Sequence, residues 1–395
     1  MKYPQLILKD GREKSLIRRH PWIFSGAVAD IEGNLQNGET VEVITNDSEY
    51  IAWAAYSPKS QIRARVWSWR KDDIPSENLF RSRIFKAVEA RKNLLSITNA
   101  MRLVNAESDG LPGLIVDRYG DTLAVQMLSS GAEYWRNLII DLLEEATGIS
   151  TIYERSDVEV RKLEGLEPSV GLVRGTQMKD LIQIHEHGVR FWVSVYEGQK
   201  TGYYLDQREN RFRLRDFSIG RDVLDCFSYT GGFGVNALAG GAESVTMVDS
   251  SKEALELASK NVKLNKLSKN NTNYIQADVF KQLRLYRDEG RTFDLVILDP
   301  PKFAPTKKQA GSASRGYKDI NLLSFKILRP GGLLFTFSCS GGISAELFQK
   351  IVAGAALDAG VDVQVIGYMR QDIDHPFALT FPEGAYLKGL ICRIV

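Results

Sequence analysis

One cysteine and four aspartates follow apolar stretches in the second half of the chain. The aspartates are Asp225, Asp249, Asp278 and Asp299, and Cys339 comes just after the apolar run LLFTF. These stretches alternate with helical patterns, which is typical of a parallel sheet with crossover helices. Because ligands bind at the carboxyl ends of strands in such sheets, we expect the five residues to gather at one edge of the sheet. Each aspartate taken alone has a simpler interpretation as an exposed loop carboxylate.

Cys339 lies between Ser338 and Ser340, where its thiol can act as a nucleophile. Carbon-5 of a pyrimidine is a poor nucleophile. A thiolate that adds to carbon-6 turns the ring into an enamine-like species whose carbon-5 attacks an electrophilic methyl group. A base then removes the carbon-5 proton and the thiolate leaves. The alternative is a small apolar core residue, and we interpret Cys226 and Cys392, which lie inside apolar strands, in that way.

The stretch from Arg221 to Ser251 predicts a strand, a glycine turn, a helix and a second strand. The turn contains Gly231, Gly232 and Gly234, and residues without Cβ atoms let the backbone approach a ligand at the helix N-terminus. Asp249, at the tip of the second strand, is placed to accept hydrogen bonds from ribose hydroxyls. An ordinary strand-to-helix turn is the alternative.

The glycine spacing resembles the D-x-F-x-x-x-G-G variant of class I methyltransferases, which bind S-adenosylmethionine. On this sequence the resemblance maps to Asp225, Phe227 and Gly231. It implies that these residues bind S-adenosylmethionine together with Asp249. It also implies that Asp278 lies near the adenine amine of the cofactor.

The strand predicted at residues 293–298 runs into the sequence DPPKF, from Asp299 to Phe303. Two prolines fix φ and remove two backbone donors, which makes the exit from the strand rigid. Amino-group methyltransferases carry a similar pattern, but with an aromatic residue directly after the prolines that stacks the base. Here Lys302 stands in that place and Phe303 comes one residue later, which weakens an amine-methylation interpretation.

The composition is that of a globular protein of 395 residues, with a formal net charge of only +2. An RNA partner would therefore have to be bound by local basic patches. The cysteines form no C-x-x-C pair, and His185 and His187 lack a third ligand, so we expect no metal site. The chain shows no signal-peptide core and no run of about 18 apolar residues, which predicts a cytoplasmic protein without a membrane span.

The pattern of elements predicts a multidomain α/β protein with boundaries at 1–73, 74–186 and 187–395. The first domain reads as a small β-barrel and the third as a Rossmann-like, doubly wound parallel sheet. The middle domain reads as α+β, with a helix over 76–95 that Ser76 can cap. Further elements are expected as strands at 6–8, 41–43, 50–56, 62–69, 114–116, 123–128, 151–154 and 181–185, and as a helix over 132–146.

Basic residues gather on the first domain. Arg63 and Arg65 are two positions apart and are predicted to point from the same strand face. With Trp22, Phe24 and Trp53 nearby, this segment resembles a PUA domain, a small RNA-binding β-barrel. A solvated charged face is the alternative. The residues predicted to contact RNA are Lys9, Arg12, Lys14, Arg18, Arg19, Arg63 and Arg65.

Several longer motifs resemble the bacterial 23S ribosomal RNA large subunit methyltransferase I family nearly from end to end. They are RHPWIFSGAV, YSPKSQIRARVW, ESDGLPGLIVDRYG, EHGVRFWVSVYEGQKTGYYLDQREN, DCFSYTGGFG, DPPKF and TFSCSGG. The resemblance implies a PUA domain, a central α+β domain and a Rossmann-like class I methyltransferase domain. It implies 5-methylcytosine formation in 23S ribosomal RNA with S-adenosyl-L-methionine as the methyl donor.

The same resemblance implies a nucleophile at Cys339, a catalytic acidic motif at Asp299, and cofactor contacts that include Tyr204, Gln207 and Asp299. The base that removes the carbon-5 proton stays open between Asp299 and Lys302, because the DPP region has no second cysteine. One alternative is an RNA methyltransferase that acts on an exocyclic amine, and another is a non-catalytic RNA-binding assembly factor. The oligomeric state is also open, with a homodimer as one alternative.

Overall fold

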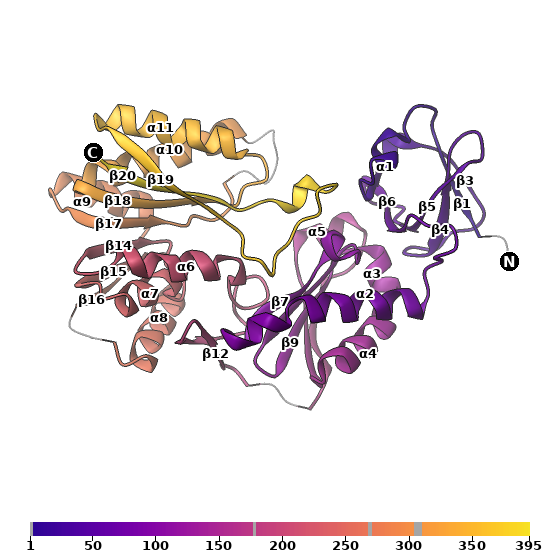
Figure 1. The fold of residues 1–395 in the computed structure, drawn as a ribbon, viewed down its shortest axis with the longest axis horizontal. Helices are drawn as coiled ribbons and strands as arrows, with labels where there is room; N and C mark the ends of the chain where they lie inside the picture. The colour runs from indigo at the N-terminus through magenta and orange to yellow at the C-terminus, as the bar shows by residue number, and fades with distance from the viewer. Residues whose placement is uncertain (1–2, 177–178, 268–270, 304–309) are drawn as a thin grey trace. The chain divides into compact units, whose positions relative to one another are not determined.

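The computed structural model describes residues 3–176, 179–267, 271–303 and 310–395 (Figure 1). Contacts within the chain separate it into two units. The first unit contains Met1–His185, Val193–Leu205 and Ile373–Gly384, and the second contains Glu186–Trp192, Asp206–Asp372 and Ala385–Val395. The division into three domains stays a prediction. None of the helices in the described ranges is both long and apolar enough to span a bilayer.

The N-terminal part of the first unit is a six-stranded sheet of order β2-β6-β5-β4-β1-β3. Alternate residues of its strands, such as Leu6 and Leu8 or Val41 and Val43, are fully buried, as expected for a sheet with one face on a core. The four predicted strands are confirmed, and two short ones were missed. The elements are β1 (Gln5–Leu8), α1 (Lys14–Ile17), β2 (Trp22–Phe24), β3 (Val28–Glu32), β4 (Thr40–Ile44), β5 (Tyr50–Tyr56) and β6 (Ile62–Ser68).

A second sheet in the first unit has the order β11-β10-β9-β8-β7. The predicted cap at Ser76 is wrong, because its side chain makes no capping hydrogen bond. The helix expected over 132–146 is two helices that meet at Trp135. The elements are α2 (Glu77–Ala90), η2 (Lys92–Ser96), β7 (Ala100–Asn105), η3 (Ala106–Asp109), β8 (Leu114–Tyr119), β9 (Thr122–Met127), α3 (Ser130–Tyr134), α4 (Arg136–Thr147), β10 (Thr151–Ser156), α5 (Glu159–Leu163) and β11 (Ser169–Arg174).

The second unit contains a seven-stranded sheet of order β16-β15-β14-β17-β18-β20-β19. A two-stranded pair, β12 (Ile182–Glu186) and β13 (Val189–Val193), precedes it. The strands of the seven-stranded sheet and the helices that accompany them are α6 (Arg208–Leu214), β14 (Asp222–Cys226), α7 (Gly232–Ala239), β15 (Ser244–Asp249), α8 (Lys252–Leu264), β16 (Thr272–Gln276), α9 (Val279–Asp288), β17 (Phe293–Leu298), α10 (Ala310–Ile327), β18 (Leu328–Ser338), α11 (Ala345–Ala359), β19 (Val363–Arg370) and β20 (Lys388–Ile394).

The seven-stranded sheet is covered on both faces, with α6, α7 and α8 on one side and α9, α10 and α11 on the other (Figure 1). This arrangement explains why residues 295–298 of β17 and residues 333–337 of β18 are nearly continuous apolar runs. Helix α10 ends at Ile327, because β18 pairs with β17 from Leu328 onward. The predicted Rossmann-like, doubly wound sheet is confirmed, with β20 antiparallel to its neighbours β18 and β19.

Arg65 was predicted to lie on an exposed cationic face, and that prediction is wrong. The side chain is buried in the first unit, with 6% of its surface exposed. Its guanidinium pairs with Glu164 at 2.8 Å and lies 3.6 Å from Glu107. Burial works against the ionisation of Glu164, but Arg65 and hydroxyl donors outweigh it and hold the pKa of Glu164 below its usual value. Arg63 is partly buried and donates to the carbonyl of Ser57 at 3.3 Å. The remaining predicted RNA contacts, Lys9, Arg12, Lys14, Arg18 and Arg19, are exposed.

Replacement of Glu164 by alanine should lower the free energy of unfolding by about 3 kcal/mol at pH 7, because buried Arg65 would lose its closer acidic partner and keep only Glu107, at 3.6 Å. Since the pKa of Glu164 is lowered on folding, its stabilising contribution is present above pH of about 4.5 and should be lost as the pH falls further. Urea unfolding at neutral and acidic pH measures both effects.

The matched control is Glu159→Ala, which breaks the exposed Glu159–Lys162 pair and should cost less than about 1 kcal/mol. Equal losses for the Glu159 and Glu164 variants would contradict the buried ion pair.

Candidate active site

Five neighbouring strands of the second unit run in the same direction and end at one edge of the sheet (Figure 1). Asp225 lies near the end of β14 and Asp249 ends β15, while Asp278, Asp299 and Cys339 come directly after or close behind β16, β17 and β18. The prediction that these residues share one edge is confirmed. Their individual roles stay predictions.

The turn after β14 is held in an uncommon backbone conformation. Phe227 and Tyr229 both have positive φ angles, 59° and 47°, although neither is glycine. Gly231 caps α7 with φ of 79°, and a Cβ on Gly234 would lie 2.3 Å from the Met247 side chain. Gly234 is therefore required for the close packing of α7 on β15, not only for approach to a ligand. Strained residues of this kind are found at ligand-binding sites, where the surrounding structure holds them in place.

Asp225 is buried, with 1% of its surface exposed, and its Oδ2 accepts a hydrogen bond from the Gly234 amide at 2.8 Å. Its other oxygen has no hydrogen-bond partner among the described residues. Burial, together with the charges of Asp299 and Asp249, raises its pKa to about 8. A buried carboxyl with one oxygen unsatisfied fits a site for a cationic or hydrogen-bonding ligand.

Asp249 fixes the turn and can still bind a ligand. Its Oδ2 accepts from the Tyr229 amide at 2.8 Å, and its Oδ1 accepts from the Ser251 amide at 2.9 Å. A carboxylate can accept about four hydrogen bonds, so lone pairs remain for ribose hydroxyls. Asp278 is exposed and caps α9 through a 2.9 Å bond from the Lys281 amide to Oδ1. Both residues can therefore line an adenosine site as predicted.

Asp299 is oriented by a chain of amides at the start of α6. The Asn210 side chain donates to Gln207 Oε1 at 2.6 Å, which leaves the Gln207 Nε2 to donate to Asp299 Oδ1 at 3.0 Å. Asn210 is itself anchored to the Arg370 carbonyl at 3.0 Å. Gln207 thus contacts the acidic motif directly. Sequence reasoning placed Gln207 in the cofactor site but not against Asp299.

Cys339 is partly exposed at the end of β18, and its Sγ lies 3.9 Å from the carbonyl oxygen of Pro300. The thiol and the DPP turn are therefore neighbours, because β17 and β18 are adjacent parallel strands. Lys302 is exposed. The Phe303 ring packs in the core, with its centroid 4.8 Å from that of Tyr317.

Lys388, on β20, is a residue that the sequence analysis missed. Its Nζ donates to the carbonyls of Ser340 at 2.8 Å and Ile343 at 2.7 Å, on either side of the turn that follows Cys339. Burial, helped by the charge of Lys302 and opposed by that of Cys339, lowers its pKa to about 8. The antiparallel register of Ser338 with Lys388 brings this amine to the site. A single lysine in a C-terminal strand carries no local signal of such a role.

The other cysteines and the histidines have structural roles. Cys226 and Cys392 are each 1% exposed and belong to the core, as predicted. His187 pairs with Glu209 at 2.7 Å. No group of three or more metal-ligating side chains is found in the described part of the chain. Tyr204 belongs to the first unit, where Lys200 Nζ lies 4.3 Å from its ring centroid, and its cofactor contact stays a prediction.

Two family models match the chain. One is described as an S-adenosylmethionine-dependent methyltransferase and matches residues 169–358, and the other is described as a PUA-like domain and matches residues 6–69. They confirm the predicted PUA-like N-terminal domain, the methyltransferase fold of the C-terminal sheet and S-adenosylmethionine as the cofactor.

Relatives of similar sequence support the same family, and solved structures support the same fold. A protein of Erwinia tasmaniensis named ribosomal RNA large subunit methyltransferase I is 52% identical over 393 residues, which is 99% of each chain. A Klebsiella pneumoniae protein of the same name is 50% identical and covers 100% of this chain and 99% of its own. The structure of a candidate S-adenosylmethionine-dependent methyltransferase from Streptococcus mutans has a TM-score of 0.84 at 23% identity, over 98% of this chain and 99% of that one. A candidate methyltransferase complexed with SAH has a TM-score of 0.86 at 24% identity, over the same shares of both chains.

The buried Asp225 should make stability depend on pH. Its pKa is about 8 in the folded protein and about 4 in the unfolded chain, so the folded state binds the proton more tightly between these values. This group should therefore lower the free energy of unfolding by about 1.4 kcal/mol per pH unit as the pH rises from about 5 to 8. Asp225→Asn keeps an acceptor for the Gly234 amide but does not titrate.

Chemical denaturation of the wild type and of Asp225→Asn across this pH range measures the effect. All other titrating groups are shared, so the difference between the two curves isolates Asp225. Parallel curves would show that Asp225 is ionised in the folded protein.

Proposed function

Because the chain belongs to the ribosomal RNA large subunit methyltransferase I family, we propose that it methylates carbon-5 of a cytosine in 23S ribosomal RNA in the cytoplasm. The observation that carries the carbon-5 chemistry is the position of Cys339. Its thiol stands at the sheet edge beside the DPP turn, 3.9 Å from the Pro300 carbonyl, and is partly exposed to a substrate.

The residues at the sheet edge fit S-adenosylmethionine. Asp249 offers acceptors for ribose hydroxyls, the exposed Asp278 can meet the adenine amine, and Asp225 and Gly231 line the turn between them. When bound, S-adenosylmethionine supplies an electrophilic methyl group on a sulfonium centre. The chain must then make carbon-5 of the cytosine nucleophilic, which falls to Cys339.

The Cys339 thiolate adds to carbon-6 and thereby raises the electron density at carbon-5. After carbon-5 has been methylated, a base must remove the carbon-5 proton. The double bond between carbon-5 and carbon-6 then forms again, the bond between Cys339 Sγ and carbon-6 breaks, and the thiolate leaves. Asp299 and Lys302 are the candidates from the sequence, and the structure adds Lys388. We favour Lys388, because a neutral amine can donate both hydrogens to the Ser340 and Ile343 carbonyls and still keep a lone pair for the proton.

The structure offers less support for the alternative of exocyclic-amine methylation. That chemistry needs no thiol, and enzymes of that kind stack the base on an aromatic residue after the prolines. Phe303 instead packs against Phe280 and Tyr317, with ring centroids 5.9 Å and 4.8 Å away. The assembly-factor alternative is disfavoured by the hydrogen-bonded turn around Asp225 and Asp249.

Cys339→Ala should abolish methylation while S-adenosylmethionine affinity, measured by calorimetry, stays unchanged. With the wild type, ribosomal RNA that carries 5-fluorocytosine at the target should form a stable protein–RNA adduct, because fluorine cannot leave as a cation after methyl transfer. Denaturing gels measure the adduct and nucleoside mass spectrometry measures the product. The same RNA should give no adduct with Cys339→Ala. Full activity of this variant, without an adduct in the wild type, would favour the exocyclic amine.

Lys388→Met should reduce kcat by about 10²–10⁴-fold if the amine removes the carbon-5 proton. The wild-type kcat should rise with pH up to about 8, as the folded-state pKa of Lys388 is passed and the amine becomes neutral. The informative comparison is Lys388→Arg, which keeps the donors to Ser340 and Ile343 but cannot lose its proton.

If Lys388 only holds the turn, Lys388→Arg should restore activity. If Lys388 is the base, the arginine variant should stay inactive. Asp299→Asn and Lys302→Met, assayed in parallel, test the other two candidates, and a loss confined to one of them would reassign the base.

A further inference from the structure

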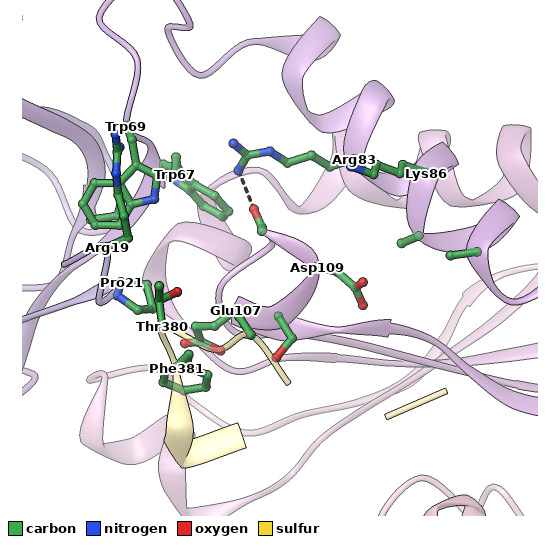
Figure 2. A pocket seen from close by; sticks show the side chains of 16 residues that line it. Arg19, Pro21, Trp67, Trp69, Arg83, Lys86, Glu107, Asp109, Thr380 and Phe381 are labelled. Atoms are coloured by element: carbon green, nitrogen blue, oxygen red, sulfur yellow. Dashed lines mark hydrogen bonds between the residues drawn. The ribbon is translucent and has the colours of Figure 1, made fainter. Parts of the chain in front are cut away.

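A hollow of about 400 Å³ lies within the first unit (Figure 2). Its walls come from five stretches of the chain. These are residues 19–21, residues 66–69 at the end of the six-stranded sheet, residues 83–90 of helix α2, residues 107–110 and residues 378–381. The hollow therefore forms only when the chain folds, and no local sequence motif predicts it.

Three cations line this hollow: Arg19, Arg83 and Lys86. Arg83 reaches from α2 and donates to the carbonyl of Gly110, as Figure 2 shows. In the described part of the chain, none of the three forms an ion pair with an acidic side chain.

The two acids of the hollow are already neutralised by other arginines. Asp109 forms a two-fold pair with Arg91, with both distances 2.8 Å. Glu107 accepts from the Trp22 indole at 2.8 Å and lies 3.6 Å from Arg65. The hollow is therefore left with an excess of positive charge, which favours an anionic ligand.

One side of the hollow is aromatic. Arg19 lies over the Trp69 ring, 5.2 Å from its centroid, and Figure 2 shows the two side chains next to each other. Trp69 is partly exposed, whereas Trp67 beside it is buried. An accessible indole next to cations can stack an unpaired base, because stacking accepts any base and arginine adds a cation–π contribution.

Arg83 gains little from its present surroundings. Burial lowers its pKa, and the charge of Asp73 offsets this only in part. Arg83 is a partly buried guanidinium that donates to the Gly110 carbonyl, and burial of its charge is unfavourable. A phosphate would offset this cost through charge-assisted hydrogen bonds.

We propose that this hollow binds one nucleotide of single-stranded RNA, with its phosphate against Arg83 and Lys86 and its base on Trp69. The inference rests on the proposed function in that the RNA is the substrate of methylation. It adds to the contacts predicted from the sequence, where Arg19 alone of these residues was included. The hollow would then fix the RNA at a point outside the catalytic sheet.

The test is the affinity of the full-length protein for a labelled single-stranded fragment of 23S ribosomal RNA, measured by fluorescence anisotropy over a range of salt. Lys86→Glu should weaken binding several-fold and reduce the slope of log affinity against log salt by about 0.7, the value for one phosphate on a single strand. Trp69→Ala should weaken binding about ten-fold or more without a change in that slope.

Lys92→Glu is the matched control. It reverses an exposed lysine just beyond α2, whose partner is the exposed Glu89, and Lys92 does not line the hollow. It should leave RNA affinity within about two-fold of the wild type. Thermal unfolding should be unchanged in the two lysine variants, whereas Trp69→Ala should lower the melting temperature because Trp69 packs on the core of the six-stranded sheet. A single cooperative transition and unchanged S-adenosylmethionine affinity then show that all three variants are folded.

The outcomes separate this inference from the proposed function. If the wild type methylates the RNA but Lys86→Glu and Trp69→Ala bind it like Lys92→Glu, the hollow is not an RNA site and the methylation proposal survives. If the wild type does not methylate the RNA, yet these two variants lose affinity and photo-crosslinks map to Trp69, the RNA site stands alone. If inorganic phosphate or a mononucleotide binds as tightly as the fragment, the hollow is a small-anion site and the RNA assignment is overturned.

Discussion

The parallel pairing of β16, β15, β14, β17 and β18 is the constraint on which the catalytic sheet depends. It brings five residues that are far apart in the sequence to one edge, and it buries the central strand β14 on both faces. Asp225 is on that strand, so its carboxyl loses water and its pKa rises to about 8. The neighbouring Asp249 and Asp299 add to the rise. The sheet therefore determines the chemistry of these acids as well as their position.

The features that could be predicted from the sequence are those with a local signal. Buried parallel strands are apolar runs, and the polar residue that follows each run marks the functional edge, which is why Asp299 and Cys339 were found in this way. The PUA-like fold and the doubly wound sheet are confirmed for this reason.

The features that could not be predicted depend on a partner distant in the sequence. Arg65 has the spacing of an exposed strand cation, but Glu164, almost one hundred positions later, draws it into the interior. Lys388 looks like an ordinary strand lysine until the register with β18 places it against the turn after Cys339. The function of Gly234 in packing on Met247 is likewise invisible in the turn itself. Charge and spacing alone do not say which side chain will be buried.

Strand β20 lies between β18 and β19, although it follows both in the chain. The nascent polypeptide therefore exposes one edge of β18 until β20 has been synthesised. Until then the turn after Cys339 also lacks the hydrogen bonds that Lys388 Nζ donates to it. Sheet closure and completion of the thiol site thus both require β20 to have been synthesised. A chain arrested before β20 would carry every glycine and aspartate of the cofactor turn and still have an open, adhesive strand edge. Such a product would be a substrate for chaperones and proteases before it could become an enzyme.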